Sequence, residues 1–446
     1  MFLRLMAGVL LSLLAASKVT AQPGVEKKPL SFKEFFNPTA LLEWESAYAL
    51  KGRKLQKTEF ILKPEFNIDL SKNIRWVILG RFYSELTDNL EPAKPGQEEV
   101  SDLSRRWIID RRLEAELREF YFDIRIKKTF ITVGKQQIVW GKADGLRVLD
   151  LVNPFNFREF LLDEFEDSRI PLWSVKANIP VKGVTAQLVW IPDQSYHDLP
   201  DPGGTYALQQ PVQDDMSVYH DPMRKPDRII RDSDIGLRLS TFFKGWDLSI
   251  NYLYFYDDFP VNFQSMLRID DTLKLNISTR YLRNHLLGGT FSNAFGSFTL
   301  RGETGFIFNK YLASNDPEQS EGVIKSNQMM AVAGLDYTGI TNTTLSAQLF
   351  IDWVTNDAHV VGRDHFETNA SLLLSRNFMN ETLTVEVIGI QNFNRGEGFV
   401  QGKVSYFLRS NLSLWFGGEI IHGEKHSFIG RFRDQDRAYL GMELGI

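Results

Sequence analysis

The feature that most constrains the fold of this chain is an alternation of hydrophobic and polar residues that recurs from one segment to the next. In residues 246–256, every even position from Trp246 to Tyr256 is aromatic or aliphatic, whereas Asp247 and Asn251 occupy intervening positions. Successive side chains of a β-strand point to opposite faces, so a period of two indicates a strand with one apolar and one polar face. No comparable helical period follows the N-terminal apolar run. We therefore predict an all-β fold.

The number and spacing of these segments predict a transmembrane antiparallel β-barrel of about 18 strands, with 16 as the lower count. The predicted strands span 39–51, 55–70, 72–85, 114–126, 129–138, 171–179, 183–192, 233–243, 246–257, 278–292, 297–309, 328–338, 343–354, 367–376, 382–391, 398–409, 411–421 and 437–446. Short turns, such as 127–128, alternate with long loops, such as 193–232. In such barrels short turns are periplasmic and long loops extracellular, so an even strand number places both chain ends in the periplasm.

The composition suits a barrel better than a soluble β-sandwich. Aromatic residues make up 13% of the chain and charged residues 24%, and the mean hydropathy is −0.22. A barrel accommodates both groups, because lipid-facing and lumen-facing side chains alternate and aromatic girdles mark the membrane interfaces. A sandwich buries its apolar faces between two sheets; each strand alone fits either fold, and the number of strands favours the barrel. The net charge of −5 argues against a nucleic-acid partner.

The N-terminus predicts export from the cytoplasm. Residues 1–21 contain one early basic residue, Arg4, then an apolar run over 5–16 and small residues up to Ala21, as in a secretory signal peptide. The run is shorter than the roughly 20 residues that a transmembrane helix needs. Residues 22–38 then form a short periplasmic segment before the barrel of 39–446, too short for the plug domain of a TonB-dependent transporter. We expect an integral outer-membrane protein of a Gram-negative bacterium.

The C-terminal strand carries a specific pattern. It resembles the C-terminal insertion signal of outer-membrane barrels, in Tyr439, Gly441, Leu444 and Ile446. The resemblance implies that the barrel-assembly machinery recognises this strand. The usual final residue of the signal is Phe or Trp, so Ile446 is a mild departure.

The third long loop, 139–170, combines turn-forming residues with many charged residues. It contains the turn formers Asp144-Gly145 and Asn153-Pro154, and connections of this length usually carry function. If the loop folds into the lumen, its charged residues become candidates for a channel constriction: Lys142, Asp144, Arg147, Asp150, Arg158, Asp163, Asp167 and Arg169. Two interpretations stay open. In the first, the charges face one another across a narrow channel and order charged solutes. In the second, they pair with one another and brace the loop against the wall.

The same region resembles a known family. The run Gly134-Lys-Gln-Gln-Ile-Val-Trp-Gly-Lys-Ala-Asp-Gly145, with Asn153-Pro154 and Asp167-Ser-Arg-Ile-Pro171, is similar to the signature of a domain-of-unknown-function family of proteobacterial outer-membrane proteins. The segment 288–303 is similar to a mid-chain hairpin of that family. The resemblance implies an outer-membrane barrel, in some genomes encoded beside RND-type exporters. Alginate-export barrels, which share a long inner loop, are more distantly similar.

Three functions follow as hypotheses. The first is a porin-like channel for passage or export of a small polar or amphiphilic solute, and the second is a structural or adaptor barrel that serves an export or lipid-handling system. A protease is the third, with His359 or His365 beside Asp357 or Asp364. We expect no enzyme activity, no cofactor and no metal. The expected partners are outer-membrane lipid and lipopolysaccharide, the barrel-assembly machinery, and an RND-type exporter or another periplasmic protein.

Overall fold

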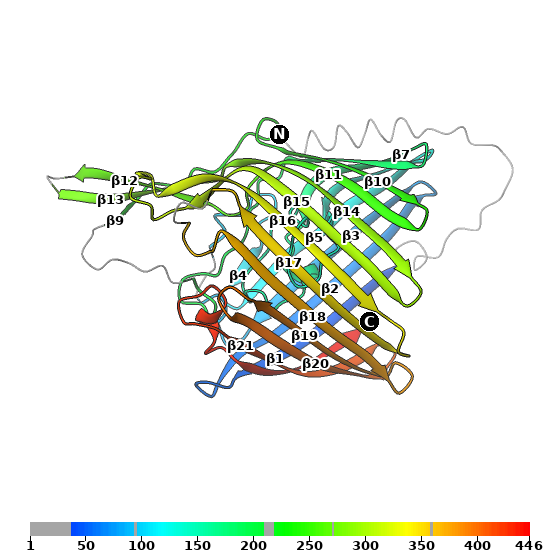
Figure 1. Ribbon diagram of the computed structural model, residues 1–446. Helices are drawn as coiled ribbons and strands as arrows, with labels where there is room; N and C mark the ends of the chain where they lie inside the picture. Colours follow the sequence, from blue (N-terminus) through cyan, green and yellow to red (C-terminus); the bar gives the residue numbers. More distant parts are fainter. Residues whose placement is uncertain (1–36, 93–95, 209–217, 270–271, 357–359) are drawn as a thin grey trace.

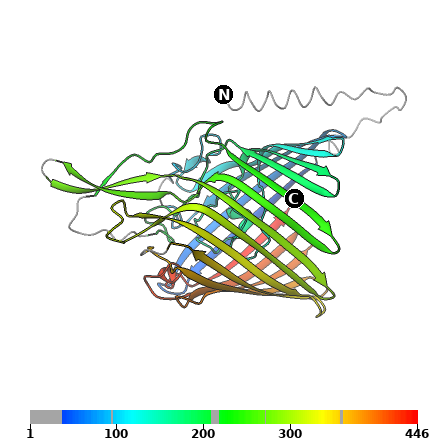
Figure 2. The ribbon, with the colours of Figure 1, turned by 45° about the horizontal axis from the view of Figure 1, so that its top comes forward.

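Eighteen antiparallel strands form the wall of a closed barrel (Figures 1 and 2). The computed structural model describes residues 37–92, 96–208, 218–269, 272–356 and 360–446. The wall strands are β1 (Pro38–Ala49), β2 (Lys54–Ser71), β3 (Ile74–Glu85), β5 (Leu113–Ile126), β6 (Thr129–Gln136), β7 (Leu172–Val181), β8 (Val184–Ile191), β10 (Asp234–Phe243), β11 (Trp246–Tyr256), β14 (Arg283–Phe295), β15 (Phe298–Ala313), β16 (Val323–Tyr337), β17 (Thr343–Val354), β18 (Phe366–Phe378), β19 (Leu383–Asn392), β20 (Glu397–Arg409), β21 (Leu412–His422) and β22 (Arg437–Gly445).

The remaining elements of the described chain are small. A short strand, β4 (Trp107–Asp110), pairs with β5, and β9 (Val218–His220), β12 (Val261–Ile269) and β13 (Thr272–Arg280) form a separate three-stranded sheet. Helical structure consists of α3 (Phe165–Ser168) and the 3-10 turn η1 (Gly430–Phe432). In these ranges no helix combines the length and the hydrophobicity needed to cross a bilayer.

The barrel closes where β1 pairs with β22. Their register runs from Leu41 opposite Gly445 to Ala49 opposite Arg437. Beyond it, Ala40 and Ile446 exchange two backbone hydrogen bonds of 3.0 and 2.8 Å. Closure gives every wall strand a partner on both sides, which removes the exposed edges that an open sheet would present.

The two ends of the barrel differ. At one, which we call the turn end, tight turns join the strands; Lys182-Gly183 and Lys244-Gly245 both have positive φ at their two residues. That conformation matches the twist of a two-residue hairpin, and glycine adopts it without steric cost. Long connections gather at the other end, the loop end, from which the β12–β13 hairpin projects in Figure 1.

The alternation observed in the sequence becomes two faces of the wall. Ile250, Leu372 and Phe416 point outward and are 63%, 64% and 62% exposed, whereas the neighbouring Asn251 and Ser371 point inward and are buried. An aliphatic and aromatic outer surface is what lipid tails require, because water is absent from the bilayer core. The predicted all-β barrel is confirmed, and each predicted wall strand corresponds to an observed one.

The prediction was wrong at 258–277, which we expected to be a long loop between two wall strands. This segment forms β12 and most of β13, and residues 278–280, predicted as the start of a wall strand, complete β13. β13 alternates as a wall strand does, with Leu273, Leu275 and Ile277 between polar residues. Its partners are β12 and β9, in a sheet separate from the wall, and a period of two does not distinguish the two kinds of sheet. The predicted signal peptide, 1–21, and nearly all of the segment 22–38 lie outside the described residues.

A glycine in the last strand gives room for a side chain that spans the closure. A Cβ at Gly441 would lie 2.3 Å from Cε2 of Trp415, and the indole Nε1 of Trp415 donates a hydrogen bond of 2.8 Å to Glu45 Oε2 on β1. Trp415 thus links β21 to β1 across β22. Tyr439, on the same inner face, is buried, whereas Leu440 and Ile446 are exposed. The role of Tyr439, Gly441, Leu444 and Ile446 in membrane insertion stays a prediction.

We predict that Gly441→Ala destabilises the barrel by about 1–3 kcal/mol, because the added methyl group forces Trp415 to move. Gly445→Ala is the matched control, since its Cβ would lie 3.7 Å from the nearest side-chain atom. The measurement is the temperature at which the folded band disappears in heat-modifiability gels. Equal temperatures for both variants would contradict the assigned role of Gly441.

Candidate functional site

The loop between β6 and β7 folds into the lumen and is fastened at its base by one buried asparagine. Oδ1 of Asn153 accepts a hydrogen bond of 2.7 Å from the backbone N–H of Ile138, and its Nδ2 donates one of 2.8 Å to the carbonyl of Ile170. Asn153 is 1% exposed. One side chain therefore joins the start, the middle and the end of the loop.

An apolar cluster fixes the loop against one half of the wall. Its loop residues pack on inward-facing side chains from β7 to β17; the buried members are Ile138, Trp140, Val148, Leu149, Val152, Leu172, Val189, Ile191, Leu253, Phe255, Leu286, Ile307, Val332 and Phe350. Burial of this many apolar side chains favours a fixed position for the loop. That half of the barrel is consequently filled.

Small residues in the wall let the loop approach closely. A Cβ at Gly236 would lie 2.6 Å from Cη2 of Trp140, and a Cβ at Gly288 would lie 2.4 Å from Cδ2 of Leu149. Trp140 also donates from Nε1 to Oε1 of Gln187 on β8 at 2.6 Å. These contacts set the loop against the backbone of the wall.

Charged groups at the edge of this cluster complete the attachment. The carboxylate of Glu303 on β15 accepts hydrogen bonds from the backbone N–H groups of Lys142, at 2.7 Å, and Leu149, at 3.2 Å. Arg301 pairs with Asp144 and donates to the carbonyl of Lys142. These contacts hold polar loop groups that would be costly to leave unpaired inside the barrel.

A cavity of about 720 Å³ occupies the other half of the lumen. It extends from Val100 and Ser104, in the connection between β3 and β4, to Phe407 and Ser413 at the turn end. Its wall comes from β1, β2, β3, β5 and β19–β22, and its inner side is made by loop residues 156–170. The loop therefore divides the lumen into a packed half and an open half.

The loop-end part of the cavity contains a buried network of ion pairs. Arg106 contacts Glu91 at 3.0 Å, Glu114 at 2.8 Å and Asp198 at 3.1 Å. Arg158 reaches Glu91 at 2.9 Å and stacks on a tyrosine ring of β3. Burial opposes ionisation of Glu91, but Arg158 and Arg106 lower its pKa to about 2. For Asp198, burial outweighs Arg106 and raises the pKa to about 7.

A second network joins the loop to the closure of the barrel. Lys57 lies within 2.6 Å of Glu159 and 2.9 Å of Glu45, and Arg437 lies within 2.7 Å of Glu159 and 2.5 Å of Glu419. Burial disfavours the carboxylate of Glu159, yet Lys57 and Arg437 lower its pKa to about 2. Removing one partner from such a group leaves an uncompensated buried charge, which costs far more than the pair contributes.

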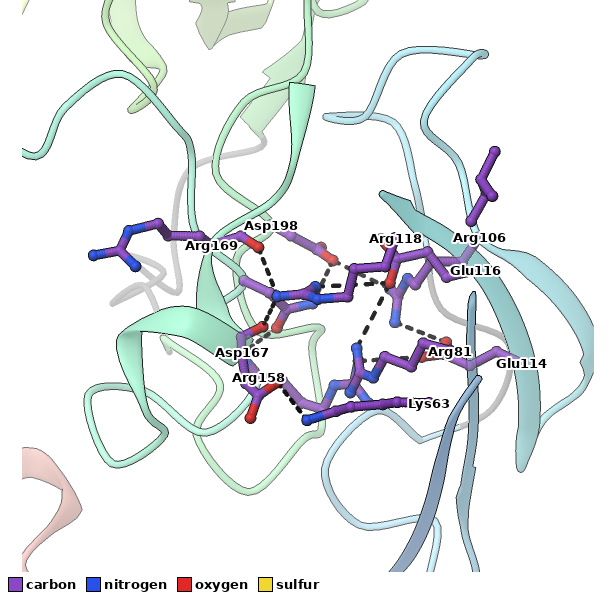
Figure 3. Close-up of polar contacts among 12 residues, drawn as sticks. Lys63, Arg81, Arg106, Glu114, Glu116, Arg118, Arg158, Asp167, Arg169 and Asp198 are labelled. Atoms are coloured by element: carbon purple, nitrogen blue, oxygen red, sulfur yellow. Dashed lines mark hydrogen bonds and ion pairs between the residues drawn. The ribbon is translucent and has the colours of Figure 1, made fainter. Parts of the chain in front are cut away.

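Basic side chains of β2 and β5 hold the short helix of the loop (Figure 3). Nη2 of Arg118 donates to the carbonyls of Glu166, Asp167 and Arg169 at 2.6, 2.8 and 3.0 Å. These carbonyls have no partner within so short a helix. Lys63 reaches Asp167 at 2.7 Å, the contact drawn in Figure 3.

The structure places the eight constriction candidates in two groups. Asp144, Arg158, Asp163 and Asp167 line the cavity, whereas the other four, Lys142, Arg147, Asp150 and Arg169, do not line it. The four outside the lining hold the loop in place: Lys142 pairs with Asp247, Asp150 pairs with Arg169 at 2.6 Å, and Arg147 stacks on the ring of Phe155 at 3.9 Å. The role of the eight residues as a constriction stays a prediction.

Asp163 differs from the other three candidates that line the cavity, because no ion pair joins it to a described residue, whereas Asp144, Arg158 and Asp167 are all paired. Its side chain is accessible to solvent but enclosed by the barrel. That enclosure, together with the negative charges of Glu159 and Asp167, raises its pKa to about 7.

Sequence reasoning missed the cations of the wall that hold the loop. Arg437 was detectable, since a period of two places it on the same inner face as Tyr439. Lys57 and Arg118 gave no signal, because the loop groups that they contact, Glu159 and the carbonyls of α3, are remote in sequence. Arg106, in the connection before β4, gave none for its contact with Asp198 for the same reason.

Of the residues proposed for a protease, the two that the structure describes, His365 and Asp364, lie apart from the cavity lining. Nε2 of His365 accepts a hydrogen bond of 2.9 Å from the indole of Trp353, and the N–H of Asp364 donates to Glu367. His359 and Asp357 lie outside the described residues. Within the described ranges, no group of three or more His, Asp or Glu side chains is placed to hold a metal ion.

Solved structures support the fold. Pseudomonas aeruginosa OccK2 (OpdF) in complex with glucuronate is similar with a TM-score of 0.51 and 11% identity, over 92% of this chain and 99% of that one. OpdK of P. aeruginosa with vanillate gives 0.51 and 12%, over 92% and 99%. OccK5 (OpdH) of the same organism gives 0.50 and 11%, over 92% and 97%. At these identities the likeness establishes the fold of outer-membrane barrels.

Sequence comparison gives the family. No curated protein matches the chain significantly. A family model described as a protein of unknown function, DUF1302, matches residues 109–382, which include the whole inner loop and the motifs on which the resemblance was based. The predicted resemblance is confirmed. The chain therefore belongs to the DUF1302 family and is an outer-membrane β-barrel of unknown function.

Proposed function

We propose that this protein is an outer-membrane channel and that a small polar or amphiphilic solute passes along the cavity beside the loop. The observation that carries the proposal is the cavity itself, about 720 Å³ in volume, reaching from the connection after β3 to the turn end. This volume is in the range of sites that accept small molecules, about 300–1,000 Å³. A barrel of 16–18 strands has a lumen wide enough for an aqueous passage.

The loop is suited to set the width of this passage. Residues 157–167 form most of the inner side of the cavity, yet their flanks lie together: the N–H of Asn156 donates to the carbonyl of Ser168 at 2.8 Å, and Phe155 bridges to Arg169. Residues 157–167 therefore project from a loop base whose two ends are hydrogen-bonded to each other. Its ion pairs with β2 and β5 hold it at a fixed distance from the wall.

The similar barrels supply indirect support. OccK2 was obtained with glucuronate and OpdK with vanillate, both small polar molecules. By analogy we expect this chain to pass a solute of comparable size. An adaptor barrel beside an RND-type exporter, the alternative that the family resemblance implies, needs no continuous passage.

We predict that replacing residues 157–167 with Gly-Gly increases the single-channel conductance of the purified protein in planar bilayers. The deletion removes side chains from the cavity and leaves the base of the loop closed. Removal of the projecting hairpin, residues 261–280, is the matched control, because Val261 and Arg280 are paired and the hairpin lies outside the cavity. The control should conduct as the unaltered protein does.

Two results would contradict the proposal. Equal conductance of the loop deletion and the unaltered protein would mean that ions take another path. Silent membranes for both proteins, despite heat-modifiable folding, would refute the channel and favour the adaptor.

We also predict that Trp140→Ala loosens the loop. A buried Trp truncated to Ala typically costs about 3–5 kcal/mol, and Trp140 is 1% exposed. The thermal unfolding midpoint should fall and open-channel current noise should rise. Trp107→Ala, at a position 64% exposed, is the control and should change neither quantity. Identical noise in both variants would show that Trp140 does not hold the loop.

A further inference from the structure

The lining of the cavity is unbalanced in charge. Thirteen acidic side chains reach it: Glu43, Glu45, Glu59, Glu116, Asp144, Glu159, Asp163, Glu164, Asp167, Asp198, Glu386, Glu419 and Glu443. Seven basic side chains do so: Lys57, Arg81, Arg106, Arg118, Arg158, Lys403 and Arg437. The lining therefore carries an excess of carboxylates.

Every basic side chain of the lining is engaged by a carboxylate. Lys57, Arg106, Arg158 and Arg437 lie in the two buried networks, and Lys403 reaches Glu164 at 3.4 Å. Arg81 and Arg118 share Glu116 at 3.7 and 3.9 Å. Two of the engaged carboxylates, Glu91 and Glu114, lie behind the lining, so they neutralise cations without reaching the cavity themselves.

Three carboxylates of the lining form none of these pairs, although one of them, Glu386, lies opposite Lys403 in the β19–β20 register. Asp163, Glu386 and Glu443 form no ion pair with any residue in the described ranges. Glu443 lies directly across the strand closure from Glu43, so like charges are neighbours there. Glu386 is three residues from the start of β19 and Glu443 two from the end of β22, which places both near the turn end.

We infer that the passage selects cations, and that Asp163, Glu386 and Glu443 determine this selectivity. The inference rests on the proposed channel function. Unpaired carboxylates in a confined passage with low-dielectric walls concentrate cations and repel anions, because the walls focus their field. The paired cations of the lining contribute little net field to oppose them.

The solute class follows from this charge. A small organic cation, or a polar solute with net positive charge, is favoured in the passage, whereas a carboxylate is disfavoured. This sign is opposite to that of glucuronate and vanillate, the carboxylates found with OccK2 and OpdK. The shared fold therefore serves solutes of different charge.

The experiment is the reversal potential of single channels in a KCl gradient at pH 8, where Asp163 is ionised despite its raised pKa. We expect a potassium-to-chloride permeability ratio of about seven or more, because a local potential of about one kT per unit charge enriches potassium and depletes chloride by about 2.7-fold each. The triple variant Asp163→Asn, Glu386→Gln, Glu443→Gln should bring the ratio close to one. Glu386→Lys, a single change at an exposed position, should also lower it.

A control with the same change in total charge is available outside the cavity. Asp227→Asn, Glu318→Gln and Glu321→Gln lie at exposed positions of the loop end and should leave the ratio unchanged. The ratio should also decline from 0.1 M to 1 M salt, because the screening length falls from about 10 Å to about 3 Å.

The outcomes separate the two proposals. Conducting channels with a ratio of one or below, or a ratio that the triple variant leaves unchanged, would overturn cation selectivity and leave the channel function intact. Folded protein that never conducts would overturn the channel function and the selectivity together.

Discussion

The packing of one loop inside the barrel is the contact on which the rest of this structure depends. A barrel of 18 strands is too wide for its own side chains to fill, so its lumen holds water unless another segment of the chain enters it. Here loop residues pack on the inner face of β8, β11 and β14–β17, in a cluster that includes Trp140 and Leu149. Because apolar contact fills that half, the opposite half keeps a polar cavity. The position of the passage is thus a consequence of where the loop packs.

The charged residues have a different function from the apolar ones. Arg118 holds the carbonyls at the end of α3, Lys63 holds Asp167, and Glu159 joins Lys57 to Arg437. Buried ion pairs of this kind add little to stability compared with apolar packing, but they fix geometry, since breaking one leaves a buried charge. The apolar cluster favours the folded-in loop, and the ion pairs set its distance from the wall. Both are needed for a cavity of defined width.

The wall was predictable from the sequence because its cause is local. Alternation in segments such as 246–256 follows directly from a bilayer on one side and a polar lumen on the other. The loop contacts were not predictable in the same way, because Glu303 and Lys142, or Lys57 and Glu159, are far apart in the chain. One feature of the sequence did indicate where the loop packs. Leu253 and Phe255 interrupt the polar face near the loop end of β11, and the structure shows that both pack in the apolar cluster.

A direct test of the divided lumen uses the absence of cysteine from this chain. Ser405→Cys places a thiol on the cavity lining, and Val332→Cys places one on the inner wall beneath the loop, where the native side chain is 6% exposed. A small, charged thiol reagent should modify the first variant rapidly in the folded protein and leave the second protected until the barrel is denatured. Rapid modification of both would show that the loop leaves the whole lumen open. Protection of both would show that no passage runs beside the loop.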